Sequence, residues 1–230
     1  MSLGEYVGSG SGVTKLLLHL NGTSVDSSGN ANNGISNNVG YGKNYGVFNQ
    51  GGLFTPGPGN NTYGSYIEIA HSTSLNFTNK FTCSIWFNKT NGWDHLFLLG
   101  KGSDWNTGYS LLLLSSGADA NLLYFSTLGT TNQTLKSKTQ FTTNVWYNVV
   151  CVYNGTNKYI YINGKLDNSI SSTGNITTNT VSLKIGRRPL IPQTFPFWGS
   201  MDEVIIENRV WSEQEIKKYY TQCKGRFATL

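Results

Sequence analysis

Residues 197–206 read FWGSMDEVII, and residues 211–216 read WSEQEI. A glycine precedes a predicted strand over 201–207, an Asp-Glu pair lies at the start of that strand, and a short helix follows. Ser212 and Glu215 have the spacing of a capping box, which predicts that the helix covers residues 212–222. Such a strand is typical of a β-sandwich whose last strand returns to the core.

The rest of the chain has the composition of a protein made of many short strands. Glycine accounts for 27 of the 230 residues, and charged residues make up 13%. Apolar runs bounded by polar turns predict strands over residues 15–20, 47–48, 66–69, 81–88, 95–101, 109–114, 122–127, 146–153, 158–162 and 182–185, in addition to 201–207. Asn154-Gly155 and Asn163-Gly164 predict hairpins on either side of one of these strands. We expect one all-β domain over residues 14–224, a flexible segment over 1–13 and a tail over 225–230.

The net charge of +5 comes from scattered basic residues, whereas a nucleic-acid-binding surface requires a clustered stripe. No run of 18 apolar residues is present, which argues against a membrane span. Residues 1–12 lack the basic start and the apolar core of a secretory signal. We therefore expect no nucleic-acid binding, no membrane insertion and no signal peptide in this chain.

The three cysteines, Cys83, Cys151 and Cys223, are an odd number and do not have the spacing of a metal site. Cys83 and Cys151 lie within apolar runs and are interpreted as small buried side chains. A disulfide between them requires that their two strands face each other.

Four segments, taken in order, resemble the laminin-G-like and concanavalin-A-like family. They are residues 16–20 with 26–30, residues 66–69 with 81–86, residues 146–150 with 161–165, and residues 185–186 with 199–204 and the helix. The resemblance covers about residues 15–222. It implies an all-β, two-sheet antiparallel β-sandwich of the concanavalin-A-like jelly-roll type with one short C-terminal helix.

Asp202 is the first candidate site residue. Simple alternation along the strand places it on the same face as Val204 and Ile206, which is the apolar, inward face. A carboxylate buried there needs an arginine, backbone N–H groups or a metal ion, because an unpaired buried charge is very costly. In relatives of this family, calcium commonly links the N-terminal region to an aspartate near the last strand.

The resemblance therefore implies a structural Ca²⁺ bound by Asp202, with Asp26 and Asn30 as further ligands. Calcium prefers six to eight oxygen ligands, and polar loops such as residues 26–30 supply them. The alternative is a capping or ion-paired aspartate, with Arg187 or Arg209 as its partner.

An enzymatic role depends on a second pair of acids. Glu203 and Glu207 are predicted to share the outer face, with Cα atoms about 13 Å apart at about 3.3 Å per residue. Glycosidases need two carboxyl groups about 5–9.5 Å apart, depending on mechanism. Ile205 lies between them, where the family's glycosidase pattern has an acid. We therefore expect a protein that is not an enzyme.

Two tryptophans in polar loops predict a binding surface. Trp93 is followed by Asp94, and Trp105 lies between Asp104 and Asn106. Large apolar side chains on loops indicate an interaction surface, where an indole stacks on a sugar ring and the polar neighbours bind its hydroxyls. The alternative is that both tryptophans fold back over the edge of the sandwich.

The loop over residues 187–197 contains three of the five prolines. Proline lowers the conformational entropy of a loop. The sequence leaves two interpretations open: the loop docks onto a neighbouring subunit or host protein, or it forms a rigid lid over one end of the sandwich.

Together these features favour a lectin-like binding or adhesion module that recognises carbohydrate or a surface receptor. Residues 14–19, TKLLLH, are similar to the opening of modules on bacteriophage tail and surface proteins. This favours a virion or extracellular surface as the location. Two alternatives remain: a structural subunit that assembles with itself or with virion proteins, and a glycan hydrolase or lyase.

Overall fold

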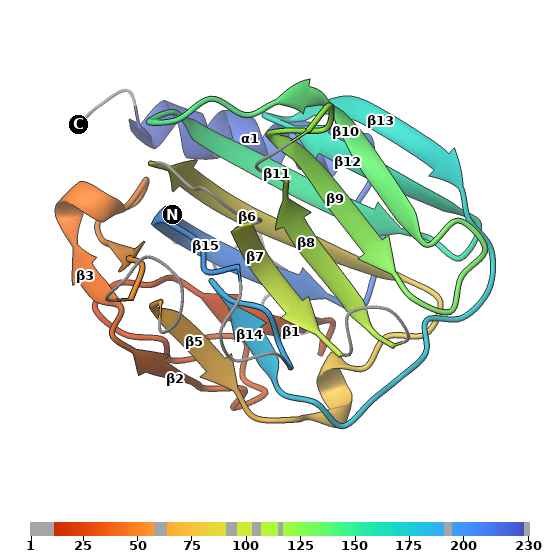
Figure 1. Ribbon diagram of the computed structural model, residues 1–230, viewed down its shortest axis with the longest axis horizontal. Coiled ribbons are helices and arrows are strands. Elements are labelled where there is room, and N and C mark those ends of the chain that lie inside the picture. The colour runs from red at the N-terminus through yellow and green to blue at the C-terminus, as the bar shows by residue number, and fades with distance from the viewer. Residues whose placement is uncertain are drawn as a thin grey trace.

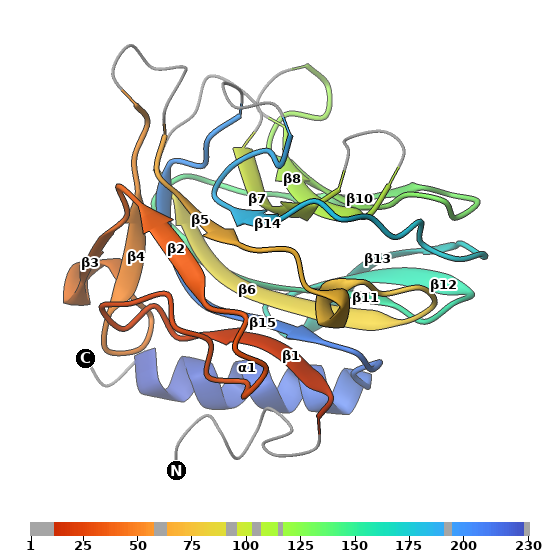
Figure 2. The same ribbon diagram turned by 90° about the horizontal axis from the view of Figure 1, so that it is seen from below.

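The computed structural model describes residues 12–57, 64–90, 96–102, 107–114, 117–190 and 195–227, with side chains up to residue 224. Two antiparallel sheets and one helix are stacked as three layers, with sheet A between sheet B and the helix (Figure 2). The two-sheet all-β sandwich with one C-terminal helix confirms the predicted fold class.

Sheet A has eight strands. Its order is β13 (Lys165–Ser171), β12 (Asn157–Ile162), β11 (Trp146–Tyr153), β6 (Phe81–Lys89), β15 (Gly199–Glu207), β4 (Gly51–Phe54) and β3 (Gly40–Gly42), with β1 (Thr14–Leu18) also paired to β15 (Figure 1).

Sheet B has seven strands. Its order is β10 (Thr134–Gln140), β9 (Leu122–Thr127), β8 (Tyr109–Leu113), β7 (Leu96–Lys101), β14 (Leu183–Ile185), β5 (Tyr66–Ile69) and β2 (Gly34–Asn37). The α-helix is α1 (Glu213–Phe227), and two 3-10 turns are η2 (Lys43–Tyr45) and η3 (Thr73–Leu75).

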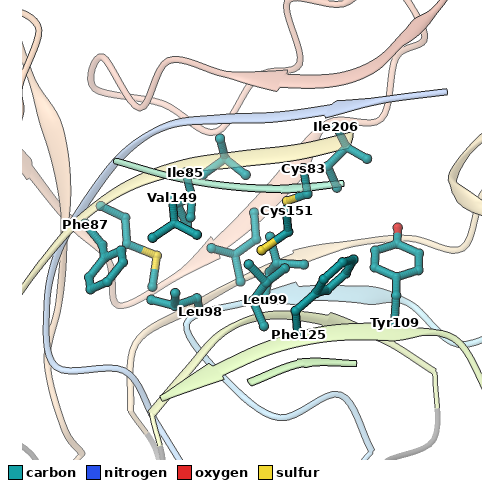
Figure 3. Packing of buried hydrophobic residues seen from close by; sticks show 14 of the residues in the cluster. Cys83, Ile85, Phe87, Leu98, Leu99, Tyr109, Phe125, Val149, Cys151 and Ile206 are labelled. Carbon is teal, nitrogen blue, oxygen red and sulfur yellow. The ribbon is translucent and has the colours of Figure 1, made fainter. Parts of the chain in front are cut away.

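The central strands of sheet A, β6, β11 and β15, are buried on both faces. One face packs against sheet B in a core that includes Ile85, Phe87 and Val149 from sheet A and Leu98 and Phe125 from sheet B (Figure 3). The other face packs against α1 through a second cluster that includes Trp86, Ile205, Ile216 and Tyr219. All nine residues of β15 are consequently buried.

Sheet B has one buried face and one open face. The burial of β9 and β10 alternates residue by residue, as expected for a sheet that is covered on one side. The helix lies on the far side of sheet A, so it leaves the outer face of sheet B uncovered (Figure 2).

Local sequence signals account for several boundaries. Asn163 and Gly164 form the two-residue turn between β12 and β13 with φ values of 51° and 76°, which confirms the predicted hairpin. At the start of α1, the Ser212 N–H and hydroxyl donate to Glu215 at 2.7 and 2.9 Å, and the Glu215 N–H donates back to Ser212 Oγ. This confirms the capping box.

The glycine before the last strand is required by a close approach. Gly199 has a φ of 140°, and a Cβ atom there would lie 2.0 Å from the Asn88 carbonyl oxygen on β6. A side chain at this position is therefore incompatible with the pairing of β15 and β6.

Five strands were not predicted, namely β2, β3, β4, β10 and β13, and residues 47–48, which were predicted as a strand, are not one. The five missed strands are short or mostly polar; within β10, Leu135 and Ser137 are the buried residues. No described helix is long and apolar enough to cross a membrane.

Cys83 and Cys151 lie directly opposite each other on β6 and β11, and both are buried free thiols (Figure 3). The strands do face each other, but the two sulfur atoms are not bonded. Burial raises the pKa of both thiols, so both remain protonated and act as small apolar side chains.

Candidate functional site

A β-bulge near the start of β15 changes the predicted orientation of Asp202. The register between β15 and β6 shifts between Asp202 and Ile205, and Glu203 has a φ of 50°. Asp202 pairs with Trp86, which lies in the cluster under α1, whereas Val204 and Ile206 lie in the core between the sheets. The prediction that Asp202 shares their face is wrong, because the bulge adds a residue and reverses the alternation.

Asp202 is fully buried, and its partners are backbone amides. Its Oδ2 accepts from Val47 N and Phe48 N at 2.8 and 2.9 Å, and its Oδ1 accepts from Glu203 N at 2.9 Å. The sequence left an arginine, backbone N–H groups or a metal ion open as partners of Asp202. The hydrogen bonds found are with backbone N–H groups, and not with Arg187 or Arg209. Burial and the nearby Glu203 carboxylate raise the pKa of Asp202, and the three amides oppose that change.

Glu203 projects toward His19. The two carboxylate oxygens of Glu203 lie 2.9 and 3.0 Å from His19 Nδ1, and the Glu203 side chain is 1% exposed. The hydrogen bond to Glu203 raises the pKa of His19, while burial opposes the shift and the Glu203 charge reinforces it.

We expect this pair to make stability depend on pH. Because the folded-state pKa of His19 lies above 6.5, its contribution is fully present below about pH 6.5 and is lost as pH rises through the raised pKa. Asp202, the buried acid beside Glu203, also titrates, so the comparison is with His19→Gln at each pH. The measurement is urea denaturation between pH 5 and 9, roughly spanning the histidine range. An unchanged difference between the two proteins across this range would contradict the prediction.

Glu207 is also fully buried, and both of its carboxylate oxygens have partners. Its Oε1 accepts from Thr14 Oγ1 at 2.9 Å, and its Oε2 accepts from Trp211 Nε1 and pairs with Arg209 Nε, both at 2.6 Å. Glu203 and Glu207 are therefore both covered by the α1 side of the molecule, where the sequence predicted an outer face. The pair does not form an open catalytic cleft.

The two N-terminal residues of the predicted calcium site lie in one loop. Asp26 accepts from the backbone of Leu17, Ser28 and Asn32 at 2.9–3.0 Å, and from Ser28 Oγ at 2.8 Å. Asn30 donates to Thr14 O and Ser28 Oγ. Asp202 has other partners, and no group of three or more His, Cys, Asp or Glu suited to a metal occurs in the part of the chain that the structure describes.

The carboxylates of Asp26 and Asp202 do not fit a calcium site, because N–H and O–H groups already donate hydrogen bonds to their oxygens. Calcium binding rests on the resemblance alone, and the hydrogen bonds of Asp26 and Asp202 argue against it at these residues. We expect the protein to have the same melting temperature in excess EDTA as in added CaCl₂. A lower melting temperature in EDTA would show that a bound cation stabilises the fold.

The open face of sheet B offers the accessible chemistry. Cross-strand pairing places Phe97, Leu112, Tyr124 and Lys136 in one row across β7 to β10. A second row contains Gly100, Ser110, Ser126 and Thr134. The rows are two residues apart, about 7 Å along the strands.

The end of the loop over 187–197 covers the β7 part of this face. Phe195 stacks on Phe97 with ring centroids 6.3 Å apart, and a Cβ atom on Gly100 would lie 3.0 Å from Pro189. Arg187 lies over the Tyr66 ring, 4.4 Å from its centroid. The described ends of the loop thus fold back over the outer face of sheet B at β5 and β7, and not over one end of the sandwich; residues 191–194 lie outside the described residues.

The part that no described segment covers is the β8–β10 platform, formed by Ser110, Leu112, Tyr124, Ser126, Thr134 and Lys136. Asp119 joins it at the edge: Tyr124 Oη donates to Asp119 at 2.5 Å, and Lys136 Nζ at 2.6 Å. These two hydrogen bonds lower the pKa of Asp119. An aromatic ring, aliphatic surface, hydroxyls and an ion pair on one face suit a polar ligand with an apolar ring face.

Sequence reasoning missed this platform. Its signal was present in residues 134–140, TLKSKTQ, where polar residues alternate with Leu135 and Ser137. The segment contains one large apolar side chain, and it was therefore not recognised as a strand.

The residues predicted to bind ligand, Trp93, Asp94, Asp104, Trp105 and Asn106, lie outside the described residues. The first loop is followed directly by Leu96, the start of β7, and the second loop begins two residues after Lys101, the end of β7. Because β7 has six residues, its two ends are about 17 Å apart. The loops therefore join the described structure at opposite ends of a strand that adjoins the β8–β10 platform.

Comparison with family models matches residues 60–217 to a family described as the concanavalin A-like lectin/glucanases superfamily. Comparison with curated proteins gives no match. Among solved structures, Domain 4 of AbnA, a GH43 extracellular arabinanase from Geobacillus stearothermophilus, in complex with arabinotriose, is similar with a TM-score of 0.69. It is 18% identical, and the match covers 90% of this chain and 97% of that chain.

Toxin binding domains are also similar. The binding domain of Paraclostridial Mosquitocidal Protein 1 has a TM-score of 0.69 at 15% identity, covering 91% of this chain and 52% of that chain. The botulinum neurotoxin serotype G binding domain has a TM-score of 0.64 at 16% identity, covering 91% and 51%. The chain spans about half the length of these toxin domains. At such identities the likeness shows a shared fold.

Proposed function

Since the chain belongs to the concanavalin A-like lectin/glucanases superfamily, we propose that it is a non-enzymatic carbohydrate-binding module whose ligand lies on the β8–β10 platform. The observation that carries the proposal is the contrast between the sheets: the centre of sheet A is buried on both faces, whereas sheet B presents an open face with aromatic, hydroxyl and charged groups. Glu203 and Glu207 support a role without catalysis, because both are fully buried.

The similar proteins support carbohydrate as the ligand class. The arabinanase domain was solved with arabinotriose, and entry of botulinum neurotoxin type C depends on two ganglioside molecules. For this chain we propose a glycan or a glycosylated receptor. The proposed setting is the exterior of a virion or cell, which rests on the resemblance of residues 14–19 to phage surface modules.

The platform is tested by Tyr124→Ala. We expect glycan-array binding of the wild-type protein and about tenfold weaker binding of the variant, because the ring supplies the stacking surface. Isothermal titration with the best array ligand measures the change, and arabinotriose is a first soluble probe. Tyr45→Ala is the control, because Tyr45 is a half-buried tyrosine on η2, which adjoins sheet A.

Equal binding by wild type and Tyr124→Ala would show that the ligand does not bind at the platform. A separate Trp93→Ala/Trp105→Ala variant tests the two loops beside β7. A defined oligomer in light scattering with no glycan bound would favour the assembly alternative. Release of reducing ends that Glu203→Gln abolishes would contradict the non-enzymatic role.

A further inference from the structure

A recessed surface lies away from the middle of the β8–β10 platform, where the edge strands of the two sheets meet beside α1. It is a cavity of about 550 Å³ between the end of β10, the start of β11, the β12–β13 turn and the C-terminal half of α1. Its volume lies within the range of about 300–1,000 Å³ that is typical of small-molecule sites. Nothing in the proposed function uses this cavity.

Two tyrosine rings line the cavity, and both are held in place. Tyr220 on α1 stacks on Trp86, with centroids 5.8 Å apart and planes at 15°. Tyr147 on β11 packs edge-on against Phe141 at 4.8 Å, and its hydroxyl lies 2.9 Å from Thr142 Oγ1. The rings therefore present fixed surfaces at little further cost in conformational entropy.

The hairpin turn fixes the rim. Asn163 Oδ1 accepts from Asn148 N at 2.9 Å, and Asn163 N donates to Asn148 O at 2.8 Å. Gly164 allows Tyr220 to lie against the turn, because a Cβ atom there would be 2.9 Å from the Tyr220 Cβ. Beside the turn, the Leu166 side chain is 47% exposed and adds apolar surface to the wall.

The charges in the cavity favour an anion. Asp167 has its carboxylate occupied by Lys138 N at 2.7 Å, Thr139 N at 3.1 Å and Thr139 Oγ1 at 2.6 Å. Lys165 and Lys224 also line the cavity, and neither has a hydrogen bond or ion pair within the described residues. Two ammonium groups are thus available, while the acid is already satisfied.

We propose that this cavity binds an anionic sugar residue of the hexuronate class. Lys165 and Lys224 pair with its carboxylate, and the apolar face of its ring packs on the tyrosine and leucine surface. Asn163 and Thr139 offer hydrogen bonds to its hydroxyls. The site is separate from the platform, so a glycan bearing uronate groups contacts the domain at two places.

The test is NMR titration of ¹⁵N-labelled protein with glucuronic acid, and with glucose as the neutral probe of the same ring size. We expect saturable shifts of the Asn163 and Leu166 amides with glucuronic acid, and about tenfold weaker binding of glucose. Lys165→Ala/Lys224→Ala should weaken glucuronic acid binding by a similar factor. Because both side chains are exposed, the fold should be retained, and the amide spectrum reports this directly.

The matched control is Lys43→Ala/Lys80→Ala, which removes the same net charge from exposed lysines outside the cavity. Tyr124→Ala should leave glucuronic acid binding unchanged, which separates this proposal from that of the platform. Equal binding of the two sugars, binding unaffected in the Lys165/Lys224 variant, or no shift at the cavity amides at millimolar ligand would each overturn the proposal.

Discussion

Replacing Asp202 with alanine should lower the free energy of unfolding by about 3 kcal/mol. The carboxylate accepts three backbone N–H groups at 2.8–2.9 Å in a site that water does not reach. Removing it leaves three buried donors without an acceptor, each costing about 1–3 kcal/mol. Relief of the repulsion from Glu203 offsets part of this loss. Urea denaturation followed by tryptophan fluorescence measures the change.

Two variants bracket the result. Asp202→Asn keeps an acceptor oxygen but places an NH₂ group near an N–H donor, so we expect about half the loss. Asp167→Ala removes a carboxylate that also accepts two backbone N–H groups, but at an edge strand that water reaches. We expect it to cost about 1 kcal/mol or less. If Asp202→Ala is as stable as Asp167→Ala, Asp202 does not anchor the segment at Val47 and Phe48.

The central strands of sheet A were predictable because they are buried on both faces. β6 is rich in aromatic and β-branched residues, and β11 and β15 contain the apolar runs 149–152 and 204–206; such segments are recognisable without knowledge of their partners. The edge strands β10 and β13 were missed for the opposite reason. Their residues are mostly polar, and they are strands because hydrogen bonds to β9 and β12 hold them.

The bulge in β15 could not be predicted from residue types. Glutamate rarely adopts the positive φ of Glu203, so nothing in the sequence marks the extra residue. Alternation then gives the wrong face for Asp202. Its partners, Val47 and Phe48, are more than 150 residues away along the chain, and only the fold brings them together. The β8–β10 platform depends in the same way on pairing between β8, β9 and β10.

Glu207→Ala should also destabilise the protein by about 3 kcal/mol, because it breaks a buried, paired charge. Thr14 Oγ1 and Trp211 Nε1 lose their acceptor, and Arg209 Nε loses its ion-pair partner. These contacts join β1, β15 and the segment that leads into α1. The loss should therefore appear as a lower midpoint in urea with an unchanged m-value.

The control is a second acid that pairs with the same arginine. Arg209 Nη1 also pairs with Glu215 at 2.6 Å, but the Glu215 side chain is 45% exposed. Glu215→Ala removes that pair and the capping box, so we expect a loss of about 1 kcal/mol. A larger effect at Glu207 than at Glu215 would show that burial, and not charge pairing as such, makes the acid on the last strand essential. Equal effects would mean that Glu207 is replaceable, and the structural role assigned to it here would be wrong.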